Sequence, residues 1–397
     1  MDKIAKELQQ LVDTNEMAGG VLIVRKRGNE IYRNKWGYMD IASQKPTEYN
    51  TMYSLCSMTK PITSVAILML EEQGKLSLED TIDTYIPGFV NDKVCKIEVE
   101  SDGSYKPSQK YPADMTLDQL MDVMHYVPAK RKLTIRDLLT HSSGLGMGGI
   151  SQHYMEKVNK YGDTLSTRIE KWKNCPLDFQ PGEATGYSPF ANMEILGRIV
   201  EIVSNREFSD FLNKKIFDPL EIHDITFRMN NAQQMRFSSL YKREHEKLVY
   251  VPEEQNEFLR ESKAGYYSGA AGLIGSVEDY DKFTTMLSNG GSFHGARILK
   301  EETVRRIYEE TGEHLLEFQP GIHWGLGMVV FSHPELLGAH AGAGTYGWSG
   351  AYGTHMFIHP ASGISATFGM NRLDIGGAAS PIARKVEELV FDTFGEN

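Results

Sequence analysis

Residues 61–70, PITSVAILML, form the longest apolar stretch of the chain and limit the folds that it can adopt. The stretch is about half of a membrane span and runs directly into two glutamates, so it predicts a buried helix rather than a membrane segment. Over 57–74, apolar residues cover most of a helical circumference, and Gly74 supplies a stop signal. The pattern therefore predicts a central helix with packing partners on every side.

Strand patterns occur near both ends of the chain. Segments 20–25 and 30–38 flank a turn at 26–29 as in a β-hairpin, and further strand patterns fall at 325–331, 355–359 and 365–370. Residues 76–265 carry mainly helical patterns, and a last helix is predicted over 380–394. The predicted fold class is α+β, an α/β sandwich whose antiparallel sheet is flanked by helices. Residues 1–75 and 266–397 would form the sheet domain, and 76–265 an inserted, mainly helical lobe.

Charge and cysteine content bear on partners and location. Asp and Glu total 53 against 42 Lys and Arg, a formal net charge of -11, which argues against a nucleic-acid partner. Residues 1–17 have the pattern of an amphipathic surface helix rather than a signal peptide, and no membrane partner is expected. Cys56, Cys95 and Cys175 form no CxxC pair, so a cytoplasmic location is expected, with Cys56 as a small buried hydrophobe.

Ser57 and Lys60 form an S-x-x-K pattern at the start of the apolar helix. Helical residues three apart share a face, so a Lys60 amine kept neutral by its surroundings could take the proton of the Ser57 hydroxyl. Ser57 would also lie at a helix N-terminus, where backbone N–H groups favour an oxyanion. A second match, Ser239 to Lys242, lies in a charged stretch. From local context alone, a solvated Ser/Lys pair is the alternative at 57–60.

Four segments have longer and more specific patterns. Residues 57–63 are SMTKPIT, 133–145 are LTIRDLLTHSSGL, 181–188 are PGEATGYS and 272–279 are GLIGSVED. They resemble the S-x-T-K-P-x-T, L-T-I-R-x-L-L-x-H-T-S-G-L, P-G-x-x-x-x-Y-S and G-G-L-x-S-T-x-x-D segments of class C β-lactamases and the related family VIII carboxylesterases. The resemblance covers nearly the whole chain and implies a β-lactamase/transpeptidase-like, penicillin-binding-protein-like fold. It also implies that Ser57 is the acylated nucleophile, Lys60 its activating partner and Tyr187 a general base or acid.

Two departures from the β-lactamase pattern bear on the reaction. The family's Y-x-N is Tyr187-Ser188-Pro189 here, and a proline side chain cannot hydrogen-bond the acyl amide of a lactam or peptide. The K-T-G strand appears as WSGA over 348–351, similar to the W-x-G of family VIII esterases. Because Trp348 replaces the lysine that helps hold a substrate carboxylate, neutral, apolar or aromatic acyl groups are expected.

Other residues are assigned to substrate binding through the same resemblance. Gly350 would let its strand approach the substrate, and the Ala351 N–H would pair with the Ser57 N–H as the oxyanion hole. Asn192 lies where several such esterases carry Asp, and it either orients Lys60 or Tyr187 or makes plain structural hydrogen bonds. His340, in a glycine-rich loop, is a candidate for the wall of the cleft. No HExxH pattern or P-loop is present, so neither a metal nor a cofactor is expected.

The expected function is that of a serine hydrolase, most simply a carboxylesterase acting on neutral short-chain or small acyl esters. The alternatives are a β-lactamase or D-Ala-directed peptidase or transpeptidase, an acyltransferase, and a non-catalytic binding protein of the same fold. The expected partner is a small-molecule ester or amide.

Overall fold

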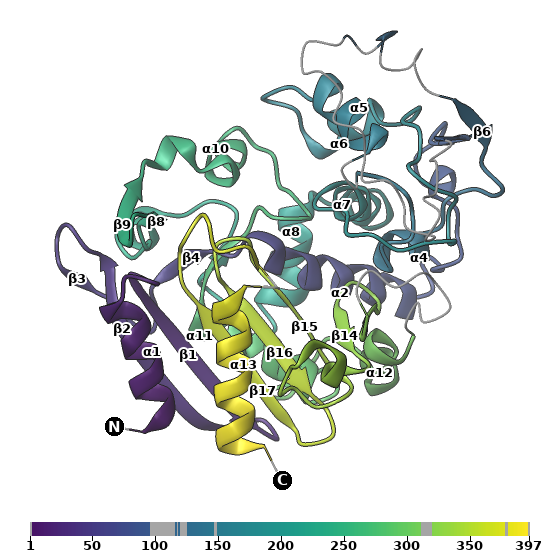
Figure 1. The fold of residues 1–397 in the computed structure, drawn as a ribbon. Helices are drawn as coiled ribbons and strands as arrows, with labels where there is room; N and C mark the ends of the chain where they lie inside the picture. Colours follow the sequence, from purple (N-terminus) through teal and green to yellow (C-terminus); the bar gives the residue numbers. More distant parts are fainter. Residues whose placement is uncertain are drawn as a thin grey trace.

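In the computed structural model, which describes residues 2–95, 116, 118, 119, 125–146, 149–310, 320–377 and 380–395, an eight-stranded antiparallel sheet forms the centre of one half of the molecule (Figure 1). Its order, β13-β14-β15-β16-β17-β1-β2-β3, joins strands from the two ends of the chain. The strands are β1 (Gly19–Lys26), β2 (Asn29–Asp40), β3 (Lys45–Pro46), β13 (Ile322–Trp324), β14 (Val329–Phe331), β15 (Thr345–Ser349), β16 (His355–His359) and β17 (Ile364–Gly369). This arrangement confirms the predicted fold class.

The strand predictions hold except at one place. The hairpin of β1 and β2 forms as predicted, and β16 and β17 match their patterns to within one residue. The stretch 325–331, predicted as one strand, is instead the turn and second strand of a β13–β14 hairpin, with Gly327 at φ +85°. Glycine tolerates this left-handed backbone, which reverses the chain between two short strands.

Helices cover both faces of the sheet. In β1, Leu22 and Val24 share an apolar cluster with α1 (Lys3–Asp13) and α13 (Pro381–Phe394), whereas Val21 and Ile23 pack with Val277 of α11 (Val277–Ser288). Figure 1 shows α1 and α13 side by side in front of the sheet. Burial on both faces explains why β1 reads as a continuous apolar run rather than an alternating one.

The apolar helix predicted over 57–74 is α2 (Thr59–Glu72), preceded by the 3₁₀ turn η1 (Cys56–Met58). Every residue from Thr59 to Leu70 is buried. The helix packs against α7 (Ala191–Ser204), and its core shares one cluster with Tyr346 and Met356 of the sheet. Within the described ranges, no helix is both long and apolar enough to cross a membrane.

The described part of 76–265 is mainly helical. It holds α4 (Ile135–Leu139), α5 (Ile150–Val158), α6 (Leu165–Glu170), α7, α8 (Phe208–Leu212), α9 (Asn231–Gln234), α10 (Glu257–Lys263), the 3₁₀ turns η2 (Ile82–Thr84) and η4 (Glu253–Gln255), and the π-helical turn η3 (Asn213–Phe217). Strands β5 (Lys93–Cys95) with β6 (Tyr126–Pro128), and β8 (Leu240–Glu244) with β9 (Lys247–Val251), form two hairpins. The bounds proposed for this lobe stay a prediction.

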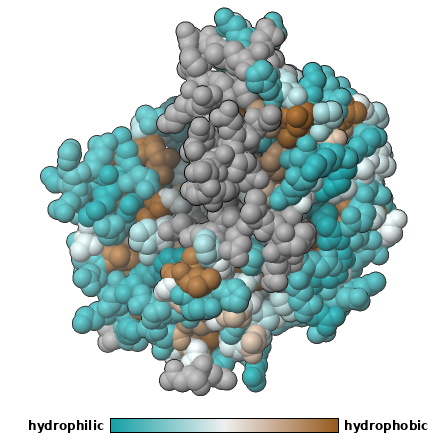
Figure 2. Space-filling view, turned by 45° about the vertical axis from the view of Figure 1, so that its right-hand side comes forward, coloured by the Kyte–Doolittle hydropathy of each residue, from teal (hydrophilic) through white to brown (hydrophobic). Residues whose placement is uncertain are grey.

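A few short elements complete the fold. β7 (Ile225–Thr226) and β4 (Met52–Ser54) both pair with β10 (Ile274–Ser276), which leads into α11. Beyond α11 lie β11 (Ser292–Phe293), β12 (Ala296–Arg297), α12 (Glu301–Glu309) and the 3₁₀ turn η5 (Pro334–Leu337). On the face seen in Figure 2, hydrophobic residues form separate small patches in a mostly hydrophilic surface, which is ordinary for a surface in water.

Candidate active site

Ser57 lies on η1, where the chain leaves β4 and enters the buried helix α2. Its predecessor Cys56 has φ +47°, so the chain turns sharply here, and the Ser57 side chain is only partly buried although its neighbours are buried. A non-glycine residue with positive φ is uncommon and is often found at functional turns. The turn presents the hydroxyl at the N-terminal end of α2.

Three polar groups meet at this point. The Ser57 Oγ is 2.8 Å from the Tyr187 hydroxyl and accepts a hydrogen bond of 3.1 Å from the Lys60 Nζ. The Lys60 Nζ lies 5.2 Å from the centroid of the Tyr187 ring. The structure thus brings together the three residues that the resemblance assigned to catalysis, at distances that allow proton transfer between them.

Lys60 is fully buried, and its second hydrogen bond, of 3.0 Å, goes to the backbone oxygen of Ala270. The segment 268–271 that carries this oxygen is held by a buried carboxylate on α7. Glu194 accepts a hydrogen bond of 2.5 Å from the Ser268 Oγ and one of 3.1 Å from the Gly269 N–H. Burial raises the pKa of Glu194, although these hydrogen bonds and the nearby Arg168 act in the opposite direction. Nothing in the sequence patterns indicated a role for Glu194.

Three aromatic side chains pack against the ring of Tyr187. It stacks on Trp324 with a centroid distance of 5.7 Å and an interplanar angle of 4°, and it contacts Trp348 at 5.1 Å and His141 at 5.3 Å. Trp324 and Trp348 belong to an apolar cluster of β13–β15 on which Tyr187 packs. These contacts limit the rotation of the Tyr187 ring and keep its hydroxyl at Ser57.

His141 lies behind Tyr187 as a neutral group. Burial, aided by the positive charge of Lys60, holds the pKa of His141 well below its usual value. The Ser188 N–H donates to the Nδ1 of His141 at 3.1 Å, so this nitrogen carries no proton and the ring is in the Nε2–H form. His141 belongs to the 133–145 segment, but the resemblance alone indicated no role for it.

Asn192 takes part in the same network. Its Nδ2 lies 3.3 Å from the His141 Nδ1, and its Oδ1 accepts a hydrogen bond of 2.6 Å from the Ser143 Oγ. Among the described hydrogen bonds, none joins Asn192 to Lys60 or Tyr187. Through His141, whose ring contacts that of Tyr187, this hydrogen-bond network reaches the candidate catalytic tyrosine.

The end of β15 lies against η1. A Cβ on Gly350 would come within 2.3 Å of the Leu55 oxygen, so only glycine permits this approach. The amides of Tyr352 and Ala351 lie next to the Cys56 thiol, whose pKa burial nevertheless raises to about 12. Cys56 is buried, as expected, and is protonated at neutral pH. The oxyanion-hole role of the Ala351 amide stays a prediction.

His340 is not part of this group. The structure places its exposed imidazole 2.9 Å from Asp392 of α13, the helix on the face of the sheet opposite α11. The prediction that His340 lines the cleft does not agree with this position, because the glycine-rich loop turns towards α13. His340, Glu388 and Asp392 offer ligand atoms within 4.8 Å of one another, but His340 and Asp392 are exposed and Glu388 is only half-buried.

A serine hydroxyl in contact with a buried lysine amine and a tyrosine hydroxyl, at the start of a central helix beside an antiparallel sheet, defines a serine hydrolase of the β-lactamase fold. The chain belongs to the Beta-lactamase family, which it matches over residues 4–389.

Known relatives agree with this assignment. The chain is 28% identical to Protein Rv1367c of Mycobacterium tuberculosis, over 92% of this chain and 88% of that one. It is 25% identical to Esterase EstB of Burkholderia gladioli, over 96% and 93% of the two chains. The solved structure of EstCE1, described as a hydrolase with promiscuous acyltransferase activity, superposes with a TM-score of 0.77 at 22% identity and covers 99% of this chain and 97% of its own. The last comparison shows the shared fold.

Proposed function

We propose that this serine hydrolase is a carboxylesterase acting on neutral, small acyl groups through an acyl-Ser57 intermediate. The observation that carries the proposal is the position of the Ser57 Oγ between the Lys60 Nζ and the Tyr187 hydroxyl. The esterase activity in the name of EstB supports the choice of ester substrates.

In the first half-reaction the Ser57 oxygen attacks the ester carbonyl, while Lys60 or a Tyr187 phenolate takes the Ser57 proton. The Ser57 and Ala351 N–H groups stabilise the negative charge that develops on the carbonyl oxygen. Tyr187 or Lys60 then protonates the departing alcohol. In the second half-reaction the same groups activate water, which attacks the acyl-serine and releases the acid. Lys60 and Tyr187 both contact the Ser57 oxygen, so the two can exchange its proton as one unit.

The surroundings of the trio favour esters over lactams. Trp348 is buried against Tyr187 where a lysine would hold a substrate carboxylate, and Pro189 offers no hydrogen bond to an acyl amide. Acyl transfer to a small alcohol or amine uses the same intermediate, and the description of EstCE1 makes it the second candidate. The intact trio argues against a protein that only binds.

The three free, buried cysteines support a cytoplasmic location.

Labelling and a substrate panel test the proposal together. A fluorophosphonate should label Ser57 alone, located by peptide mapping, and Ser57→Ala should abolish both labelling and hydrolysis of a short-chain nitrophenyl ester. Ser239→Ala is the matched control, because Ser239 belongs to the second S-x-x-K but lies beside a strand and donates to Asp40. Labelling that survives Ser57→Ala would refute the assignment of Ser57 as the nucleophile. Faster turnover of a cephalosporin or a D-Ala-D-Ala peptide than of the nitrophenyl ester would contradict the esterase proposal.

A further inference from the structure

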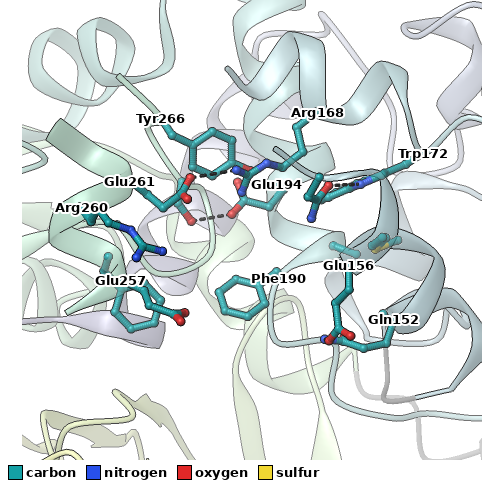
Figure 3. A pocket seen from close by; sticks show the side chains of 17 residues that line it. Gln152, Glu156, Arg168, Trp172, Phe190, Glu194, Glu257, Arg260, Glu261 and Tyr266 are labelled. Atoms are coloured by element: carbon teal, nitrogen blue, oxygen red, sulfur yellow. Dashed lines mark hydrogen bonds and ion pairs between the residues drawn. The ribbon is translucent and has the colours of Figure 1, made fainter. Parts of the chain in front are cut away.

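One group of buried charges outside the Ser–Lys–Tyr trio lines a cavity of about 390 Å³ among α5, α6, α7 and α10 (Figure 3). There the Arg168 Nη2 donates to Glu261 at 2.8 Å, and Glu194 is bound to the 268–271 segment that supports Lys60. Arg168 and Glu194 thus already have partners. A second group of buried charges, behind the end of β15, takes no part in the proton transfers of the trio.

This second group joins β15, β16 and α13. Ser349 and His355 lie directly opposite each other in the β15–β16 pair, with 2.6 Å between the Ser349 Oγ and the His355 Nδ1. The His355 Nε2 lies 3.1 Å from the Glu387 Oε1 of α13, and the Glu387 Oε2 accepts a hydrogen bond of 3.0 Å from Arg384. Ser349, His355 and Glu387 are each at most 5% exposed. These four residues, the β15–α13 link, connect the last residue of β15 to the helix.

The charge of Glu387 sets the direction of the contacts in the β15–α13 link. Burial acts to raise the pKa of Glu387, but His355 and Arg384 outweigh burial and hold this pKa below its usual value. An ionised carboxylate only accepts hydrogen bonds, so the His355 Nε2 that faces it carries a proton. In the neutral ring, Nδ1 then has no proton and accepts the hydrogen of the Ser349 hydroxyl. The Ser349 side chain is thereby held in one orientation.

The β15–α13 link holds the base of a turn that lies against the nucleophile segment. Its serine and its histidine flank the turn 350–354, which carries the Ala351 amide. A backbone hydrogen bond of 2.7 Å joins the first N–H of this turn to its last carbonyl oxygen. On the side of the nucleophile, the Thr354 Oγ1 donates to the Leu55 oxygen at 3.1 Å, two residues before Ser57. The direction of the Ala351 N–H therefore depends on how the base of the turn is held.

We propose that His355 and Glu387 are positioning residues for ester hydrolysis. By holding the turn 350–354, they direct the Ala351 N–H at the carbonyl oxygen of the bound ester. Desolvation offsets most of the attraction within a buried ion pair, so the pair adds little net stability but fixes the direction of the groups that it joins. The inference rests on the proposed acyl-serine mechanism, in which the Ala351 amide is one of the two oxyanion donors.

Glu387→Gln and Ser349→Ala weaken the β15–α13 link at two points without adding bulk. Loss of a whole oxyanion donor costs about 10²–10³ in kcat, so a misdirected donor should cost about tenfold. We expect each variant to lower kcat on nitrophenyl acetate about tenfold with KM unchanged. Each should weaken the binding of phenylboronic acid by a similar factor, because its tetrahedral adduct on Ser57 places an oxygen in the oxyanion hole. Both changes act through His355, so the double variant should be no worse than the stronger single one.

His359→Gln is the matched control. His359 also lies on β16, with its Nδ1 2.8 Å from the Ser362 Oγ and its ring against Phe391 of α13, but at the end of the strand away from the turn. This variant should leave kcat and the affinity for the boronic acid unchanged. The proposal is overturned if Glu387→Gln and Ser349→Ala lower the melting temperature but leave kcat and this affinity unchanged, or if their effects on kcat add in the double variant.

Failure of the esterase function itself is recognised separately, because the wild-type enzyme would then be labelled by a fluorophosphonate at Ser57 but would cleave no ester. The rate of labelling then replaces kcat, since the phosphonyl oxygen occupies the oxyanion hole during attack by Ser57. Labelling that Glu387→Gln slows about tenfold and His359→Gln does not supports the positioning role, and equal labelling rates contradict it. Absence of labelling at Ser57 would overturn both proposals.

Discussion

At the scale of single residues, the feature that bears on the proposed specificity is the aromatic surroundings of Tyr187. Trp348 and Trp324 lie 4.7 Å apart between ring centroids, and both contact Tyr187. An aromatic wall stabilises apolar groups and offers no positive charge to a carboxylate. The proposed preference for neutral acyl groups would therefore be a property of a few side chains rather than of the fold.

We predict that a neutral nitrophenyl ester exceeds a carboxylate-bearing cephalosporin in kcat/KM by at least about a hundredfold, or roughly 2.7 kcal/mol. Trp348→Lys should narrow this gap in kcat/KM, mainly by improving lactam turnover. The gap should not close, because Pro189 still offers no side-chain hydrogen bond to the acyl amide. Trp348→Phe, which keeps an apolar ring, separates loss of packing from gain of charge. A gap that both variants narrow equally would argue against the charge explanation.

Because His141 is buried and neutral, we predict that the stability of the folded protein depends on pH. Its pKa is lower in the folded protein than in the unfolded chain, so the unfolded chain binds the proton more readily. Stability is therefore complete above about pH 6.5 and falls as the pH drops below that value, by up to about 1.4 kcal/mol per pH unit. His141→Asn, whose Oδ1 can still accept the Ser188 N–H, should flatten this dependence. Thermal unfolding midpoints between pH 5 and 8 measure it, and parallel curves would exclude His141 as the cause.

At the scale of elements, helix α7 and the segment 268–271 form a support for Lys60. The Thr63 Oγ1 donates to the Gly269 oxygen at 2.6 Å, and the Ser268 Oγ accepts from the Ala270 and Ala271 N–H groups. Glu194 closes this network from α7. The carbonyl that binds Lys60 is thus fixed from α2 and α7 together.

We predict that Glu194 is a positioning residue. Glu194→Gln keeps the shape but weakens two charge-assisted hydrogen bonds, which should cost about 2 kcal/mol of stability. We expect kcat on a nitrophenyl ester to fall about tenfold, a shift in the pH–kcat profile, and little change in KM. Glu201→Gln, two turns further along α7, is the control for the helix itself. An unchanged pH profile with a lowered melting temperature would show that Glu194 is merely structural.

At the scale of the whole molecule, the sheet is closed by strands from opposite ends of the chain. β1 pairs with β17 from Val21↔Gly369 to Lys26↔Ile364, and the Arg25 Nε of β1 donates to Asp281 of α11 at 2.6 Å. Burial raises the pKa of Asp281 to about 6, against the opposing effect of Arg25. The packing of α11 on β1 thus joins parts of the chain that are far apart in sequence.

We expect ester hydrolysis to persist in excess EDTA, because the Ser–Lys–Tyr trio supplies its own proton transfer and needs no Lewis acid. The group of His340, Glu388 and Asp392 lies outside the trio, and His340→Ala should leave the rate of ester hydrolysis unchanged. Initial rates before and after dialysis against EDTA measure this. Loss of activity that added zinc restores would contradict the prediction.

The sequence alone determined what depends on local pattern: the all-round apolar helix α2, the β1–β2 hairpin, the last helix, and the positions of Ser57, Lys60 and Tyr187 within family-like segments. Tertiary structure decided the rest. Trp324 and Glu194 gave no local signal, because they meet the trio from separate elements, β13 and α7. The prediction for His340 failed because the glycines around it do not determine the direction of the loop. In the folded protein His340 lies beside Asp392 of α13 instead of in the cleft. Periodicity describes which face of an element is buried, whereas the partner on that face follows only from how the whole chain packs.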